Sequence, residues 1–178
     1  MLAVVVFLAV QNFVTQPYRV EQQSMQKTLD PGQYVLVDKL TPRFDDYSRG
    51  DIVVFHPPGL PVTATPYIKR VIGVAGDHIE LRGGFVLVNG QRIVEQYTYD
   101  GQPTDPEGTQ TAWTLVTGQL FVMGDHRQVS ADSRATDVGP VPVSNVIGRA
   151  WLSYWPLSKL GLIDTPRYPD LAPTTGSP

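Results

Sequence analysis

The sequence predicts a mainly antiparallel β fold with little helix beyond an apolar N-terminal segment. Short apolar runs of strand length recur between turn residues, and 16 glycines and 16 prolines supply many turns. The dipeptide Asn89-Gly90 separates the runs FVLV and RIVE, an arrangement typical of a β-hairpin. With 178 residues, 42% of them hydrophobic, the chain is long enough for one domain with a substantial core.

The first element is the segment MLAVVVFLAVQNFV, in which only Gln11 and Asn12 are polar. As a helix it would be roughly 21 Å long, against a hydrocarbon core of ~30 Å. No basic residues precede it and no A-x-A motif follows directly, so it does not match a cleavable signal peptide. We expect residues 1–16 to be part of a membrane anchor, and a buried N-terminal strand or helix is the alternative.

A β-rich domain is expected to follow over residues 17–163. Its strands are placed, in chain order, at residues 34–40, 51–57, 67–75, 77–83, 85–88, 92–95, 119–125 and 149–156. The stretch SNVIG before the last strand suits one helical turn capped by Ser144 or Asn145.

Two segments lack the pattern of either strand or helix. Residues 96–118 are polar and contain Pro103 and Pro106, so we expect an inserted loop or ribbon there. Residues 164–178 are Pro-rich and poor in core-forming residues, which predicts a disordered tail.

Composition excludes several functional classes. A net charge of −3 without a basic block argues against a nucleic-acid surface. The absence of cysteine excludes a Cys nucleophile, disulfides and Cys-ligated zinc. The three histidines do not have the HExxH spacing, and neither GxxxxGK[ST] nor GxSxG occurs. We therefore expect no metal and no cofactor.

Lys69 lies in the middle of an apolar predicted strand, YIKRVIGVA. Because alternate residues of a strand share a face, Lys69 shares one face with Tyr67 and Val71, while Arg70 lies on the other. An edge-strand lysine reaching water is one interpretation. The other is a desolvated lysine whose pKa is lowered, which makes it a usable general base.

Two further segments combine with Lys69. Ser24 lies in a loop between the N-terminal segment and the first expected strand of the domain. Downstream, ten consecutive positions contain four charged residues without strand or helix periodicity, which indicates a cross-linked polar loop. These residues are Asp125, Arg127, Asp132 and Arg134.

Four segments together resemble type I signal peptidases, which are membrane-anchored serine proteases with a Ser/Lys dyad. The matching segments occur in the family's order at residues 24–28, 49–55, 69–77 and 124–134, and cover about 20–145. Two positions depart from the family pattern: Lys27 replaces the usual Pro, and His126 replaces the usual Asn. The implied fold has antiparallel coiled, barrel-like β-sheets and an N-terminal membrane-anchoring helix.

The resemblance implies a role for each matching residue. Ser24 would be the nucleophile, Lys69 the general base, and Ser130 the serine that hydrogen-bonds and orients the lysine. The backbone N–H of Ser24 would stabilise the oxyanion, with the Gln22 amide as a possible second donor. A salt-bridged scaffold behind the site is assigned to Arg70, Asp132 and Arg134.

The same resemblance implies where the enzyme acts. It would cut preproteins after signal peptides with small residues one and three positions before the cut, bound as an added strand. The catalytic domain of a monomer with a single membrane span would lie on the extracytoplasmic side of the cytoplasmic membrane. Ten residues separate Val14 from Ser24, at most ~33–36 Å of chain, which keeps the nucleophile near the lipid bilayer.

Trp151, Tyr154 and Trp155 would line the membrane interface or belong to the core.

Three alternatives stay open at this level. Another Ser/Lys peptidase is one, although a self-cleaving repressor would need a DNA-binding domain where the apolar segment lies. A Ser-His-Asp hydrolase using His126 is the second, and its only neighbouring carboxylate, Asp125, is poorly placed to orient the ring. The third is an inactive homologue that binds extended peptides.

Overall fold

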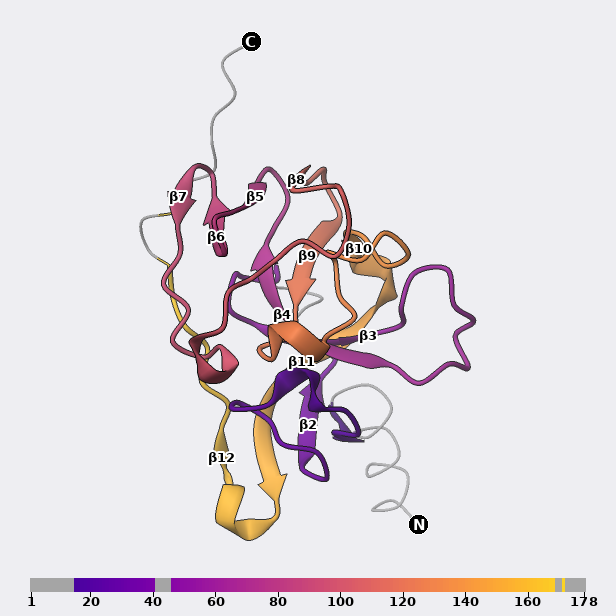
Figure 1. The fold of residues 1–178 in the computed structure, drawn as a ribbon. Coiled ribbons are helices and arrows are strands. Elements are labelled where there is room, and N and C mark those ends of the chain that lie inside the picture. Colours follow the sequence, from indigo (N-terminus) through magenta and orange to yellow (C-terminus); the bar gives the residue numbers. More distant parts are fainter. Residues whose placement is uncertain (1–14, 41–45, 169–170, 172–178) are drawn as a thin grey trace.

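The computed structural model describes residues 15–40, 46–168 and 171, and it confirms a mainly β, antiparallel fold (Figure 1). Twelve strands of these residues form two sheets. The strands are β1 (Thr15–Arg19), β2 (Tyr34–Asp38), β3 (Ile52–Phe55), β4 (Tyr67–Gly73), β5 (His78–Arg82), β6 (Phe85–Val88), β7 (Gln91–Arg92), β8 (Ala112–Thr114), β9 (Gln119–Met123), β10 (Val141–Pro142), β11 (Val146–Trp155) and β12 (Gly161–Leu162).

Helical structure in this part of the chain is limited to single 3-10 turns. They are η1 (Gln23–Met25), η3 (Tyr99–Gly101), η4 (Arg127–Val129), η5 (Val143–Asn145) and η6 (Leu157–Lys159). The helical turn expected at residues 144–148 is η5, displaced towards the N-terminus. No helix of the described ranges combines the length and apolar character needed to cross a bilayer.

The expected anchor falls almost entirely outside the described residues. Residues 1–14 are not described, and Thr15 and Gln16 already belong to β1, which pairs with β2. Residues 15 and 16 are therefore strand, and the anchor expected over 1–14 stays a prediction.

In the larger sheet β4 is an interior strand, between β3 and β9. Its strand order is β1-β2-β11-β3-β4-β9-β10, with β12 paired to β11, and the smaller sheet runs β7-β6-β5-β8. In Figure 1 the smaller sheet lies at the top and the β11–β12 hairpin extends at the bottom. Residue Lys69 pairs with Val53 of β3, whereas β9 pairs with β4 only from Arg70 onward. The backbone at Tyr67–Lys69 therefore has one strand partner among the described residues.

The core explains why the apolar runs form these strands. All four residues of β3 are buried, and β2 alternates between buried and half-buried residues as a strand with one covered face does. On one face of β4, Tyr67 and Val71 belong to the apolar cluster that also contains Val53 and Phe55. On the other face, Ile68 and Ile72 belong to two other apolar clusters. The predicted alternation of faces around Lys69 is thus confirmed.

The hairpin predicted at Asn89-Gly90 is present between β6 and β7. Asn89 has φ 53° and Gly90 has φ 78°, the two positive values that the tightest hairpin turn requires. The inserted segment 96–118 contains one 3-10 turn and the short strand β8, which pairs with β5. It is therefore partly ribbon and partly loop.

The C-terminal segment differs from the disordered tail expected from residue 164. Over 164–168 and at Leu171 it packs on the domain: the Tyr168 hydroxyl donates to the Tyr97 hydroxyl (2.8 Å), and Leu171 is 8% exposed in the core. Arg49 donates to the Leu171 carbonyl (2.9 Å). These few contacts involve aromatic and backbone groups, which composition alone does not reveal.

Gly50 shows how closely this segment approaches. Its φ is +95°, and a Cβ at this position would overlap the carbonyl oxygen of Pro166. Gly59 has a similar φ of +77° but open space around its Cα. Both glycines therefore have a positive φ, but only Gly50 also lacks space for a Cβ atom.

We expect Gly50→Ala to lower the free energy of unfolding by about 3 kcal/mol, because it combines positive-φ strain with overpacking. Gly59→Ala should cost only about 1 kcal/mol, since strain acts alone. Urea unfolding of both variants measures the difference. Equal losses would show that the C-terminal segment does not pack against Gly50 in solution.

Candidate active site

Ser24 is held in the single 3-10 turn η1, between β1 and β2. The next residue, Met25, is fully buried, and Leu29 packs in the same apolar cluster. The Thr28 and Leu29 amides both donate to the Met25 carbonyl (3.1 and 2.8 Å). The turn is thus fastened to the core immediately after Ser24, which limits how far its hydroxyl can move.

The structure brings Ser24 and Lys69 together across 45 residues of sequence. The Nζ of Lys69 lies 2.7 Å from the Oγ of Ser24, and the two residues are 1% and 2% exposed. The amine also lies 5.1 Å from the centre of the Tyr67 ring. Lys69 does not reach water at a sheet edge, so the surface interpretation of this residue is wrong.

Burial sets the charge state of the amine. Desolvation is the largest effect and lowers the pKa of Lys69 from 10.5 to about 8, because a charged ammonium loses its hydration in the interior. The carboxylate of Asp132 partly opposes this by attracting the charged form, and Arg134 acts in the same direction as burial. A substantial fraction of the amine is therefore neutral near pH 8.

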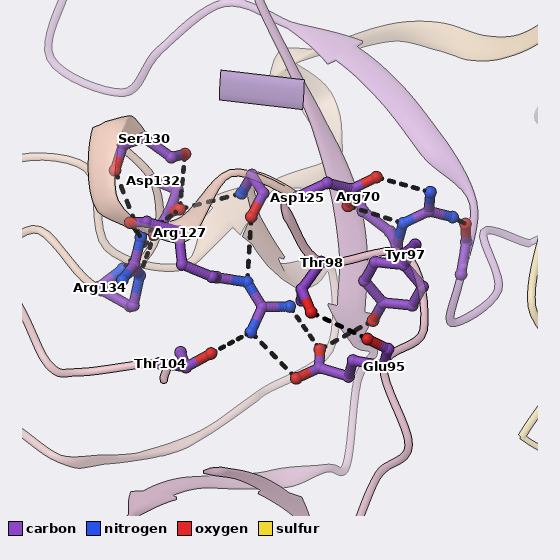
Figure 2. A network of polar contacts seen from close by, with 12 residues as sticks. Arg70, Glu95, Tyr97, Thr98, Thr104, Asp125, Arg127, Ser130, Asp132 and Arg134 are labelled. Carbon is purple, nitrogen blue, oxygen red and sulfur yellow. Dashed lines mark hydrogen bonds and ion pairs between the residues drawn. The ribbon is translucent and has the colours of Figure 1, made fainter. Parts of the chain in front are cut away.

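Ser130, Asp132 and Arg134 form one buried cluster, at the left of Figure 2. The Ser130 hydroxyl donates to Asp132 Oδ2 (2.7 Å), and Arg134 Nε donates to Asp132 Oδ1 (2.8 Å). Asp132 and Arg134 therefore form the expected ion pair. Among the described residues no hydrogen bond joins Ser130 to Lys69, although the family resemblance implied one; the Ser130 hydroxyl donates to Asp132 instead.

Gly124 explains how this cluster lies so close to the nucleophile turn. A Cβ on Gly124 would overlap both the Ser130 hydroxyl and the Ser24 carbonyl oxygen. The Gly124 amide donates to Asp132 Oδ2 (3.0 Å). A larger residue would separate Ser24 from the cluster behind it.

Arg70 forms an ion pair with Asp125, separate from that of Asp132 and Arg134. Its guanidinium donates to both oxygens of Asp125, at 2.9 and 2.8 Å, and not to Asp132 (Figure 2). Both residues are almost fully buried, and the guanidinium lies 4.1 Å from the centre of the Tyr97 ring. The Thr28 hydroxyl donates to Asp125 as well, which links this pair to the nucleophile turn.

The partners of two arginines of the site, Glu95 and two residues of the inserted segment 96–118, were not singled out by sequence reasoning. Arg127 forms an ion pair with Glu95 and donates to the Thr104 hydroxyl, as Figure 2 shows at its centre. Arg134 pairs with Glu107 (3.0 Å). The only available signal was the presence of carboxylates in a polar segment, which does not identify their partners.

The two departures from the family pattern both contact that segment. The Lys27 ammonium donates to the carbonyl oxygens of Gln96 and Thr98, the second at 3.1 Å. The His126 ring stacks on Tyr99, with 4.2 Å between ring centres and 22° between planes. His126 Nδ1 lies 3.1 Å from Gln26 Oε1, so the ring is not aimed at Ser24 and the Ser-His-Asp alternative loses its geometric basis.

A groove lies beside the dyad, between residues 18–22 and 65–68. Its walls end two residues before Ser24 and one before Lys69. The side of β4 at Tyr67–Lys69 that does not pair with β3 is open to a further strand, as far as the described residues show. Gln22 lies in this groove with an exposed side chain.

The buried amine makes stability depend on pH in a specific direction. Because the pKa of Lys69 is lower in the folded state, the unfolded chain binds more protons between about pH 8 and 10.5, and stability rises with pH in that window. We expect this group to contribute about 3 kcal/mol of gain between those limits. The difference in unfolding free energy between wild type and Lys69→Met, measured across that range, isolates the effect. A difference that does not change with pH would mean that the amine is solvated.

The sequence is similar to proteins of a known family. Residues 1–155 match the family model described as signal peptidase, peptidase S26. A signal peptidase I of Leptolyngbya laminosa is 35% identical over 170 residues, covering 93% of this chain and 81% of the relative. A probable signal peptidase I of Synechocystis is 36% identical over 166 residues, covering 90% and 82%.

A crystal structure of a signal peptidase I from Enterococcus faecalis has a TM-score of 0.47 and 28% identity, covering 59% of this chain and 97% of that one. The family match extends over most of the sequence, and the relatives are matched over more than two thirds of their own length. The chain therefore belongs to the signal peptidase family, peptidase S26, and is a peptidase.

Proposed function

We propose that this peptidase removes signal peptides from preproteins at the membrane surface, with Ser24 as nucleophile and Lys69 as general base. One observation carries the proposal: the 2.7 Å contact between a buried lysine amine and a buried serine hydroxyl. A serine hydroxyl alone is a weak nucleophile, and an adjacent base is the usual means of activating it.

The reaction follows from the charge state of the amine. In the neutral form, Lys69 Nζ accepts the proton of Ser24 Oγ while that oxygen attacks the scissile carbonyl carbon. The resulting ammonium gives its proton to the leaving amine as the C–N bond breaks and an acyl-enzyme forms. The neutral amine then takes a proton from water, which attacks the ester, and passes that proton to the Ser24 oxygen as the ester bond breaks.

The supporting groups act on charge and position. We assign oxyanion stabilisation to the backbone N–H of Ser24, with the Gln22 side chain as a second donor. Ser130 acts through Asp132, whose carboxylate opposes part of the desolvation of Lys69. Arg134 and Arg70 hold Asp132 and Asp125 in place and take no part in the chemistry.

The groove supports an extended substrate. A peptide lying between residues 18–22 and 65–68 would continue the sheet along the open side of β4 at Tyr67–Lys69. Tyr18, Val20 and Ile68 line the groove, so its wall favours apolar side chains. Small residues near the cut, as in signal peptides, would let the scissile carbonyl approach Ser24.

An exposed apolar hairpin supports action at a bilayer. Trp155, Leu157, Leu160 and Leu162 of the β11–β12 hairpin are 52–76% exposed. Large apolar side chains gathered at one tip mark an interaction site rather than a solvated surface. We propose that this hairpin contacts lipid, with residues 1–14 providing a single-span anchor and the domain, a monomer, on the extracytoplasmic side.

Cleavage of a preprotein tests the dyad. We expect Ser24→Ala and Lys69→Met each to lower the rate at least about 1000-fold, because nucleophile and base act as one unit. Cleavage of a model preprotein in detergent, with the cut position read by mass spectrometry, gives the result. Ser144→Ala, at an exposed serine, and Lys39→Met serve as matched controls.

The same assay gives a pH profile. Wild-type kcat/KM should rise with an apparent pKa of about 8 and then level off, because only the neutral amine accepts a proton. Normal cleavage by Ser24→Ala would show that Ser24 is not the nucleophile. A rate that rises only above pH 10 would show that Lys69 does not act as a neutral base with a lowered pKa.

The hairpin has its own test. The double variant Leu157→Ser/Leu160→Ser should lose at least about threefold in rate on a preprotein embedded in phospholipid vesicles, since less apolar surface enters the lipid. Its rate on a soluble peptide should not change. The control is Leu60→Ser/Val62→Ser, which alters equally exposed apolar residues in the β3–β4 loop. A larger loss in the control would place the lipid-facing surface elsewhere.

A further inference from the structure

Lys27 and His126 contact the same short segment, residues 96–99. We propose that Lys27 and His126 are positioning residues: they fasten segment 96–99 to the nucleophile turn, residues 24–28, and thereby hold Ser24 within reach of Lys69. This inference rests on the proposed function of Ser24 and Lys69.

The backbone at Lys27 shows why a fastening is needed. Its φ is +81°, a left-handed conformation that residues with a Cβ rarely adopt and that proline cannot adopt. Such a conformation persists only where surrounding contacts impose it. The turn in this chain therefore has a different path from one restrained by a proline ring.

The Lys27 side chain supplies the first contact. Its ammonium donates to two backbone carbonyls, of Gln96 and Thr98, across about 70 residues of sequence. Backbone acceptors do not move with side-chain rotamers, so the contact restrains the path of both segments. The flanking Thr28 is held to Asp125, which leaves residue 27 between two fixed points.

His126 supplies the second contact. Its ring lies on the Tyr99 ring and its Nδ1 lies 3.1 Å from Gln26 Oε1, so it joins the segment to the turn. Its backbone N–H donates to the Ser24 carbonyl (3.0 Å). Any displacement of His126 is therefore transmitted to the nucleophile itself.

Segment 96–99 is firm enough to serve as a support. Just before the segment, Glu95 forms an ion pair with buried Arg127. Within it, the Tyr97 ring lies against the Arg70 guanidinium. At its end, the Tyr99 amide donates to the Asp125 carbonyl (2.9 Å). Figure 2 shows Glu95, Tyr97 and Thr98 beside these two arginines. The inserted segment thus connects the nucleophile turn to the ion-pair network behind it.

The geometry predicts which kinetic constant changes. Neither Lys27 nor His126 lines the groove between residues 18–22 and 65–68, so we expect neither side chain to contact a substrate bound there. The alignment of Ser24 with Lys69 does, and a displacement of the order of 1 Å lowers the rate of a positioned reaction strongly. Loss of the contacts should lower kcat and leave KM unchanged.

A series of substitutions at residue 27 distinguishes the effect of the ammonium from the effect of the backbone conformation. We expect Lys27→Met to lower the single-turnover rate roughly tenfold with KM within about twofold of wild type. Lys27→Arg should restore most of the rate because it keeps the cation. Lys27→Gly relieves the φ strain but lacks the ammonium, so it should be as impaired as Lys27→Met. Lys27→Pro, whose ring excludes the positive φ and which lacks the ammonium, should be impaired most.

Two measurements keep this test independent of general stability. The rate is expressed per acylatable active site, and the thermal midpoint and the exchange rate of the Thr98 amide are measured alongside, with Lys39→Met as the matched control. His126→Phe, which keeps the stack and loses the ring nitrogen, should show the same selective loss of kcat. The pH at which the rate reaches half its plateau should stay the same, because the burial and the neighbouring charges that set the pKa of Lys69 do not involve Lys27 or His126.

Full rates in Lys27→Met and Lys27→Gly would overturn the proposal. So would a fall in the thermal midpoint with an unchanged rate per active site, which indicates a purely structural role. Ser24→Ala in the same assay distinguishes a failure of the positioning role from a failure of the proposed function. If Ser24→Ala is inactive while Lys27→Met is normal, only the positioning role fails; if Ser24→Ala is active, the proposed function fails with it.

Discussion

The removal of one lysine amine from water is the constraint on which the structure around the site depends. An ammonium in that position is costly, and the protein resolves the cost by lowering the pKa of Lys69 to about 8 rather than by giving it a close carboxylate. This requires that β4 lie inside the sheet, with β3 beside it and apolar residues on both faces. The Ser24 hydroxyl is then the polar partner that the buried amine meets.

The charged residues near the site compensate the charge of that amine only in part. Arg70 is paired with Asp125 on one side, and Arg134 with Asp132 on the other, so each buried carboxylate is already neutralised by a guanidinium. Asp132 attracts the charged form of Lys69, while Arg134 beside it has the opposite effect. Buried ion pairs contribute little net stability. Here they place polar groups close to Lys69 without restoring its charge.

Much of the fold was predictable because its signals are local. The strands around Val53 and Lys69, the Asn89-Gly90 hairpin and the absence of long helices in the described residues follow from apolar periodicity and turn chemistry. The packing of residues 164–168 and Leu171 was not, since it depends on two aromatic hydroxyls and a few backbone groups meeting across the domain. A Pro-rich composition is typical of disordered segments, but a few long-range contacts are enough to fix such a segment on the domain.

The residue types needed for the site could be read from the printed sequence: a lysine among apolar neighbours, a serine in a loop, and a segment rich in aspartate and arginine. Which of these residues contact one another became known from the folded chain. It paired Arg70 with Asp125, directed Ser130 to Asp132, and brought Lys27 to the carbonyls of residues 96 and 98. The physical reason is that hydrogen bonds and ion pairs depend on distances between segments far apart in the chain. Neither periodicity nor composition contains those distances.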